Sequence, residues 1–258
     1  MKENNFILTK LGKFSLHNPI VIEGLPGVGN VGKISVDFLI DSLKAKKIIE
    51  IKSFYMPNCV FINENDEIEL PKLEIYYVKI KKQDILFLTG DLQPIDEYSC
   101  YEICNNLLHF FKEINVKEII TLGGLGLEET PKDPNIFCSG TSKEIIKKYC
   151  LPNILKGTEG VFGPIIGIAG VLIGLGKEFN IPGVVLLVET SNHHSLLGIK
   201  GSQKLISVLK SKFKLNIDTK ELEKEIIDIE KELKGKFLNK KLQEKPKHPK
   251  EESMNYIG

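Results

Sequence analysis

The sequence has 258 residues, of which 42% are hydrophobic, and its formal net charge is +1 at pH 7. This length and composition are typical of one large α/β domain with a substantial core. The near-neutral balance is unlike that of proteins that bind nucleic acid or a charged membrane surface, so we expect neither as a partner.

The first organised stretch is a strand, a glycine-rich turn and a helix. An apolar run at 20–22 precedes the turn, and apolar residues recur at helical spacing over about 30–45. Glycines suit a tight turn because they adopt positive φ and let backbones approach closely. The candidate ligand-binding or partner-facing residues in this turn are Gly24, Pro26, Gly27, Gly29, Asn30 and Gly32.

Three interpretations of this turn are open. Gly27, Gly29 and Gly32 match the dinucleotide fingerprint, and Glu50 lies at about the offset of a ribose ligand, roughly 20 residues on. The free N–H groups at the start of the following helix would instead suit phosphate or another small anion. We favour a third interpretation, a structural or partner-facing turn, because Gly24 and Pro26 already reverse the chain.

Further strands, part of them antiparallel, are predicted along the next hundred residues. The apolar runs that indicate them lie at 6–8, 14–16, 47–54, 59–62, 67–70, 73–80, 85–89 and 116–122. Asn63–Asp66 reads as a hairpin turn, and Ile103 and Phe111 belong to the apolar stripe of a helix. The order of these elements is unlike a simple βαβ repeat.

Glycine-rich turns at 24–32, 90–94 and 123–126 each follow a predicted strand. Open α/β sheets place their sites at the carboxyl ends of strands, so we expect these turns to converge on one crevice. Its further candidate residues are Asp91, Gln93, Gly123 and Gly124, and its acids would be Asp91, Glu128 and Glu129. The alternative is that these acids are solvated turn residues.

The next part of the chain offers weaker functional signals. Small residues recur through 160–174, which indicates close packing of a buried helix or a subunit contact, and a buried strand follows at 182–188. Glu189 with His193 and His194 could serve as acid/base groups or metal ligands. No third ligand stands at motif spacing, so we expect no metal. Short helices are predicted at 142–149 and 201–213.

Cysteine and arginine usage narrows the function classes. Cys59, Cys100, Cys104, Cys138 and Cys150 are an odd, scattered set, which fits a reducing cytoplasm better than a disulfide framework. All 35 basic residues are lysines, so the rigid fork with which arginine grips phosphate is absent. This lowers the expectation of an enzyme that acts on nucleotides or orthophosphate.

Composition changes towards the carboxyl end, and we divide the chain into 1–215, an α/β domain; 216–238, an amphipathic helix; and 239–258, a flexible tail. Leucine and isoleucine at 4-3-4 spacing from Leu222 to Leu233 predict the helix. The tail is dominated by lysine, glutamate and proline, which predicts disorder. It ends in Met254-Asn-Tyr256-Ile257-Gly258, which is either a docking peptide or a terminal segment without a binding role.

Several of these strings together resemble the PAC2 family, the proteasome assembly chaperone family with archaeal members. They are Gly24–Gly32, Gly90–Pro94, Gly123-Gly124, the run at 160–176 and Leu187–Thr190, in the order found in the family. The resemblance implies a three-layer α/β fold similar to nucleoside phosphorylases, with a mixed, mainly parallel sheet. It also implies homo-oligomers, a trimer or tetramer here, no established catalysis and no cofactor.

The resemblance also implies a partner. Family members are implicated in proteasome assembly, and some archaeal members resemble ATP-independent activators that dock through a hydrophobic–Tyr–any-residue tail. Here Tyr256 is third from the end, one position earlier than in that motif.

Two functions of different class follow. The first is a cytoplasmic interaction protein that binds 20S proteasome subunits. The second is a nucleotide or small-molecule enzyme of phosphorylase-like or ATP-grasp-like type that uses the Gly24–Gly32 turn. The missing arginine, the lack of a base–nucleophile pair and the tail favour the first, so we predict no catalytic residues.

Overall fold

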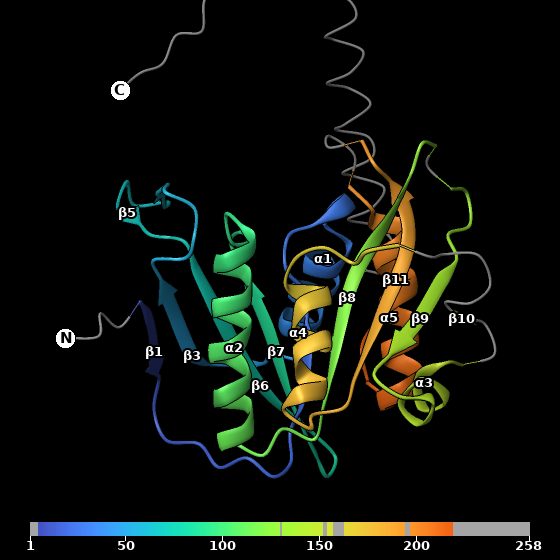
Figure 1. Cartoon of the computed structure of the whole chain (residues 1–258), viewed down its shortest axis with the longest axis horizontal. Helices are drawn as coiled ribbons and strands as arrows, with labels where there is room; N and C mark the ends of the chain where they lie inside the picture. Colours follow the sequence, from blue (N-terminus) through green and yellow to red (C-terminus); the bar gives the residue numbers. More distant parts are fainter. Residues whose placement is uncertain (1–4, 130, 152–153, 157–162, 194–196, 219–258) are drawn as a thin grey trace, which may run out of the picture. The chain divides into compact units, whose positions relative to one another are not determined.

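Apolar runs form the strands of one nine-stranded sheet in the order β1-β3-β6-β7-β2-β8-β11-β9-β10, with β4 and β5 as a separate hairpin (Figure 1). The strands are Phe6–Lys10 (β1), Ile20–Glu23 (β2), Lys46–Ser53 (β3), Phe61–Ile62 (β4), Ile68–Glu69 (β5), Lys72–Ile80 (β6), Gln83–Gly90 (β7), Glu118–Leu127 (β8), Ile136–Gly140 (β9), Leu155–Lys156 (β10) and Gly183–Ser191 (β11). The computed structural model describes residues 5–129, 131–151, 154–156, 163–193 and 197–218. All of them lie in the unit Met1–Asp218, one of the two into which the chain divides.

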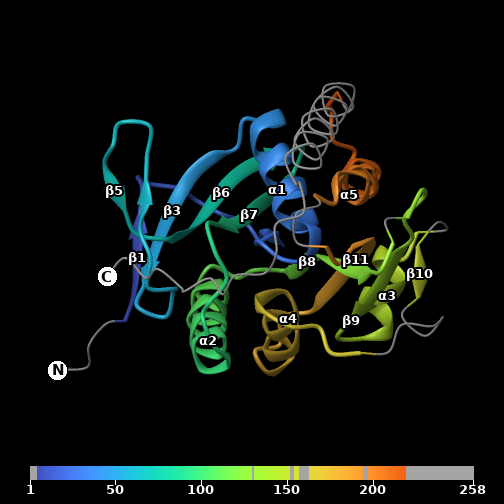
Figure 2. The same cartoon turned by 90° about the horizontal axis from the view of Figure 1, so that it is seen from above.

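Helices cover both faces of the sheet, which confirms the predicted α/β class. They are the 3-10 turn Val28–Asn30 (η1) and the α-helices Val31–Ser42 (α1), Glu97–Glu113 (α2), Lys143–Tyr149 (α3), Ile168–Glu178 (α4) and Ile199–Phe213 (α5). Figure 2 shows α2 and α4 side by side on one face of the sheet, and α1 and α5 on the other. Within the described part of the chain, no helix is long and apolar enough to cross a membrane.

The sheet is mixed, but it is parallel only in part. The central strands β7, β2, β8 and β11 run parallel to their neighbours in this group, whereas β1, β3 and β6 join the sheet through antiparallel pairs, and so does β9. Parallel and antiparallel pairings are therefore about balanced, unlike the mainly parallel sheet predicted from the sequence. The difference arises because the hairpin-linked strands after β3 reverse direction without crossover helices.

Burial explains why the central strands are continuous apolar runs. In β7 the residues Ile85, Leu86, Phe87 and Leu88 are all fully buried, as expected for a strand covered by helices on both faces. Helix α2 begins after Asp96, whose side chain accepts a hydrogen bond from the Ser99 backbone N at 2.7 Å. Its apolar stripe then packs with α4 on the sheet in the main hydrophobic core.

Other expectations differ in detail. The predicted strand at 14–16 does not form, although Phe14 and Leu16 do pack against the core. The predicted hairpin around Asn63–Asp66 is confirmed, with Phe61 opposite Glu69 and Ile62 opposite Ile68. The C-terminal helix and tail lie outside the described residues from 219 onward, and so do His194 and the tip residues Met254, Tyr256, Ile257 and Gly258.

Candidate functional site at the carboxyl edge of the sheet

The glycine turn closes tightly onto the start of α1. After β2 the backbone N of Gly24 donates to the Leu88 carbonyl at 3.0 Å, which fixes the turn to β7. A Cβ added at Gly24 would collide with the Gly32 carbonyl oxygen. Glycine at these positions therefore lets the end of β2 and the first turn of α1 touch, so this part of the motif is filled by its own backbone.

The same turn lies directly against two other strands. A Cβ at Gly124 on β8 would collide with the Val28 carbonyl oxygen, and one at Gly29 would stand 2.6 Å from Thr190 Oγ1 on β11. The Gly198 backbone N also donates to the Gly29 carbonyl at 2.7 Å. The structure thus brings the turns at 24–32 and 123–124 together, as predicted, and adds the segment before α5.

Gln93 ties the third predicted turn to this group. Its Nε2 donates to the Pro26 carbonyl at 3.0 Å, and its Oε1 accepts from the Ile168 backbone N at 3.2 Å. One side chain therefore bridges the glycine turn and the start of α4. The convergence of the turns at 24–32, 90–94 and 123–126 that the sequence predicts is present in the fold.

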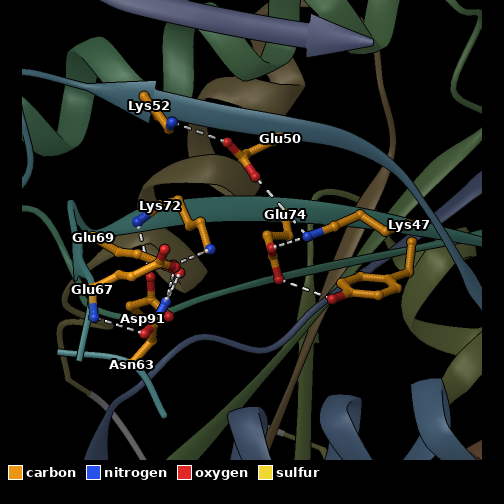
Figure 3. Close-up of polar contacts among 10 residues, drawn as sticks. Lys47, Glu50, Lys52, Asn63, Glu67, Glu69, Lys72, Glu74 and Asp91 are labelled. Carbon is orange, nitrogen blue, oxygen red and sulfur yellow. Dashed lines mark hydrogen bonds and ion pairs between the residues drawn. The ribbon is translucent and has the colours of Figure 1, made fainter. Parts of the chain in front are cut away.

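The predicted acids do not gather there. Asp91 faces away to the start of β6, where its Oδ2 accepts from the Lys72 backbone N at 3.0 Å (Figure 3). Glu128 and Glu129 are exposed beyond the end of β8. Because a carboxylate that anchors a strand end is already paired, Asp91 has a structural role, and the interpretation of these acids as turn residues fits better.

Glu50 is also distant from the glycine turn. It lies on β3, and β6 and β7 separate β3 from β2, a spacing of about 14 Å at roughly 4.8 Å per strand. Its carboxylate pairs with Lys52 at 3.3 Å and Lys47 at 3.9 Å in the charged ladder of Figure 3. The prediction that Glu50 binds a ribose is therefore wrong, and the dinucleotide interpretation is left without the acidic residue of the fingerprint.

Asn30 closes the turn from within. Its Oδ1 accepts from the Gly27 backbone N at 3.3 Å, while its own backbone N donates to the Gly27 carbonyl at 2.9 Å. Asn30 itself has φ 53°, a left-handed conformation that asparagine tolerates better than most residues. These bonds occupy the Gly27 and Asn30 backbone N–H groups within the turn itself, which leaves fewer N–H groups to bind an anion.

The two central glycines of the motif differ in conformation, which gives a matched pair of variants. Gly29 has φ 62° and would press a Cβ against Thr190, so Gly29→Ala should cost at least about 1 kcal/mol of unfolding free energy. Gly27 is extended at φ −168°, against the sequence expectation of positive φ, with no atom nearer than 4.0 Å to an added Cβ. Gly27→Ala should stay within about 0.5 kcal/mol of the wild type. Urea unfolding of both variants checks this, and equal losses would contradict it.

One carboxyl group that the sequence did not single out lies beneath the turn. Glu23 ends β2 fully buried; its Oε1 accepts from the Leu25 backbone N at 3.2 Å, and its Oε2 has no hydrogen-bond partner among the described residues. Burial raises the pKa of Glu23 from 4.5 to about 8, and the Leu25 hydrogen bond offsets only part of this rise. The group is therefore largely neutral at pH 7.

A second polar cluster, at Lys33, Asp37 and Thr89, resembles catalytic machinery but has its hydroxyl group buried. Thr89 Oγ1 donates a hydrogen bond to Asp37 at 2.8 Å and accepts one from Lys33 Nζ at 3.4 Å. Lys33 and Asp37 also form an ion pair at 2.8 Å. A hydroxyl beside a lysine and a carboxylate is the arrangement of an activated nucleophile. Thr89 itself is buried on β7, however, whereas the Lys33 and Asp37 side chains are partly exposed, so the hydroxyl group lies at the inner end of the cluster.

The remaining candidate ligands are engaged elsewhere. Glu189 accepts from the backbone N and the side-chain Nδ2 of Asn135, at 2.8 and 3.0 Å, which ties β11 to the chain before β9. Cys100 and Cys104 are both buried on α2. Across the residues that the structure describes, no group of three or more His, Cys, Asp or Glu side chains is placed to hold a metal ion.

Large apolar side chains surround the converged turns. They come from the four segments that lead into or begin α1, α2, α4 and α5, with 39% to 86% of each side chain exposed: Val28, Ile95, Tyr98, Ile166 and Leu197, here called the carboxyl-edge surface. These loops lie at one edge because the parallel strands β2, β7, β8 and β11 all end there (Figure 1). Exposed apolar side chains gathered at one edge are typical of a protein-binding surface.

Comparison with known proteins identifies the family. The family model described as "PAC2 family" matches residues 21–235, most of the chain. The chain belongs to the PAC2 family. The match begins in β2 and so contains the whole glycine turn. The family resemblance predicted from Gly24–Gly32 together with the later strings is therefore confirmed.

Solved and curated relatives support this assignment. The chain is similar to PbaB of Pyrococcus furiosus, described as an archaeal proteasome activator, with 32% identity, a TM-score of 0.81 and coverage of 90% of this chain and 98% of that chain. It is similar to PbaA of the same organism, an archaeal homolog of proteasome-assembly chaperone, with 25% identity, a TM-score of 0.76 and coverage of 92% and 93%. An uncharacterized protein of Methanocaldococcus jannaschii is 29% identical, with 94% of this chain and 93% of the relative covered.

Proposed function

We propose that this PAC2 protein binds 20S proteasome subunits, as an assembly chaperone or as an ATP-independent activator. The similarity to PbaB, a proteasome activator, and to PbaA, an assembly-chaperone homolog, supports this partner. The proposal includes a cytoplasmic location and a homo-oligomer, a trimer or tetramer. The predicted domain boundaries at 215 and 238 and the likeness to nucleoside phosphorylases remain predictions.

The observation that carries the proposal is the nature of the carboxyl edge. The glycines of the motif allow close backbone contacts, between Gly24 and Gly32 and between Gly124 and Val28. Apolar side chains surround that closed turn. Of the carboxylates predicted to line a crevice there, Asp91 is hydrogen-bonded to β6, and Glu128 and Glu129 are exposed to solvent. An edge that is filled, rigid and apolar suits recognition of a protein surface better than binding and turnover of a small polar substrate.

The C-terminal tip forms a second part of the proposal. Met254, Tyr256 and Ile257 are apolar or aromatic residues at the end of a charged segment, so burial on a partner would remove them from water. We propose that the tip adds to the contact made by the carboxyl-edge surface.

Binding of a nucleotide is the competing function, and calorimetry separates the two. No arginine is available to clamp phosphates, and the glycine turn is closed, so we expect no tight complex with ATP, NAD or a nucleoside plus phosphate. A dissociation constant at or below about 10 μM, roughly −7 kcal/mol, for any of these ligands would overturn the chaperone or activator proposal.

Purification of the full chain with 20S proteasome subunits tests the proposal itself. We expect the chain to elute with the subunits from size-exclusion chromatography at physiological salt. Elution of all components at their separate volumes, at concentrations of about 10 μM, would contradict it.

A further inference from the structure

A basic cavity lies at the edge of the sheet opposite the carboxyl-edge surface. It has a volume of about 620 Å³, and Lys82, Lys112 and Lys117 line it together with the apolar residues Val116 and Phe179. No Asp or Glu is among its lining residues. Its elements are the segments that lead into β2, β7, β8 and β11, so the cavity gathers positive charge at the amino ends of the central strands.

The three lysines have no ion-pair partner within the described part of the chain. Lys112 lies in the last turn of α2, where its charge complements the helix dipole. Lys82 and Lys117 stand in loops before β7 and β8, so no helix end accounts for them. Unpaired cations around a partly apolar cavity indicate a site for an acidic group on a partner.

The acidic counterpart is the turn of the β4–β5 hairpin. Glu64, Asp66 and Glu67 are all exposed in the segment 63–67. The turn is fixed, because Asn63 Oδ1 accepts from the backbone N atoms of Asn65 at 2.9 Å and Glu67 at 3.0 Å. The acids are therefore presented in a defined shape, at little cost in conformational entropy on binding.

Exposed apolar residues flank these acids. Ile62 and Ile68 face each other across the hairpin and are 71% and 72% exposed. A two-stranded hairpin that leaves its apolar residues in water is marginally stable alone. The hairpin thus carries the same combination as the cavity, apolar residues beside charge, with the opposite sign of charge.

Hairpin and cavity cannot meet within one chain. The hairpin joins the carboxyl end of β3 to the start of β6, at the upper left in Figure 1, whereas the cavity lies at the amino ends of the parallel strands. The eight residues of β7 alone span about 26 Å between these edges, at roughly 3.3 Å per residue. The complementary surfaces are therefore available only to different molecules.

We propose that the acidic hairpin turn 63–67 of one copy docks in the Lys82–Lys112–Lys117 cavity of a second copy. Such a contact is head-to-tail, because two different surfaces meet, and it generates a ring when the rotation between copies closes. The inference rests on the proposed homo-oligomer and not on binding to the proteasome. Self-association measured without proteasome therefore tests it separately.

Charge reversal and its rescue form the test, with the full chain studied by sedimentation velocity over a concentration series. Glu64→Lys with Glu67→Lys should weaken self-association at least about tenfold, and Lys82→Glu with Lys117→Glu should do the same. In the combined four-residue variant, lysines on the hairpin face glutamates in the cavity, so the attraction is restored with its signs exchanged. Its dissociation constant for self-association should therefore return to within about threefold of the wild type. Lys147→Glu with Lys200→Glu, exposed on α3 and α5, carries the same charge change as the cavity variant and should leave self-association unchanged.

Several results would overturn the proposal. A wild type that stays monomeric at about 100 μM has no such contact. Unchanged association of either double variant, with native circular dichroism, places the interface elsewhere. Failure of the combined variant to recover shows that hairpin and cavity bind different partners. Loss of 20S association in the cavity variant, with self-association intact, assigns the cavity to the proteasome instead of a second copy.

Discussion

Glu23→Gln should remove most of the dependence of unfolding free energy on pH between about 4.5 and 8. In the folded chain burial raises the pKa of Glu23 to about 8, whereas in the unfolded chain the carboxyl ionises near 4.5. Between these values the folded state holds a proton that the unfolded state has lost, so stability falls as pH rises. This contribution is fully present below about pH 4.5 and is lost as pH rises through about 8.

The expected size follows from that window. Each pH unit inside it costs the wild type up to about 1.4 kcal/mol, so the total loss is at most about 5 kcal/mol. Glutamine keeps the acceptor for the Leu25 backbone N and cannot ionise. The variant should therefore match the wild type near pH 4.5 and exceed it by a few kcal/mol at pH 8.

Urea unfolding at half-unit steps of pH measures this difference. Glu128→Gln is the matched control, because Glu128 is exposed after β8, and this change should leave the pH profile of the wild type intact. Parallel profiles for the wild type and Glu23→Gln would show that the carboxyl group is ionised within the fold, with water or a cation meeting its second oxygen.

Deletion of residues 254–258 should leave the fold intact and weaken association with the 20S proteasome. Burying two or three side chains of one tip gives weak binding, because the entropy lost when a segment is ordered on a partner opposes the gain. Several tips on one oligomer raise avidity by about 10²–10⁴ without a new contact, so their joint removal should lower the apparent affinity by a similar factor. Tyr256→Ala should reproduce most of this loss, since the ring is the largest apolar group in the tip.

Asn255→Ala is the control for the tip, because it shortens a polar side chain and keeps Met254, Tyr256 and Ile257. A side-by-side pull-down at matched salt compares it with the deletion and with Tyr256→Ala. Equal retention of all variants with the wild type would remove the tip from the docking account. The partner contact would then rest on the carboxyl-edge surface alone.

Local chemistry made the glycine turn predictable from the sequence. A strand, a run of closely spaced glycines and a helical apolar pattern can meet in few ways. The sequence therefore predicted correctly that Gly24, Gly29 and Gly32 lie in the turn and helix start that follow β2. The same reasoning gave the hairpin around Asn63–Asp66 and the convergence of the turns at strand ends. Each of these depends on residues near in sequence or on a general rule of parallel strands.

Long-range strand order decided what the sequence did not reveal. Glu50 follows the glycine motif at about the right offset, but β6 and β7 insert between its strand and β2. Asp91 follows a glycine, but it lies beside the start of β6, where the Lys72 backbone N donates a hydrogen bond to its carboxylate. The burial of Glu23 depends on the central place of β2 between β7 and β8, so only the unusual acid at the end of an apolar strand could have signalled it.

Native mass spectrometry of the full chain mixed with 20S proteasome subunits tests the central claim most directly, because it reports both partner and stoichiometry. The account predicts masses that correspond to the chain, as an oligomer, in complex with 20S subunits at concentrations of about 10 μM. Spectra that contain only the free chain and the free subunits, under conditions in which other proteasome complexes survive, would contradict it.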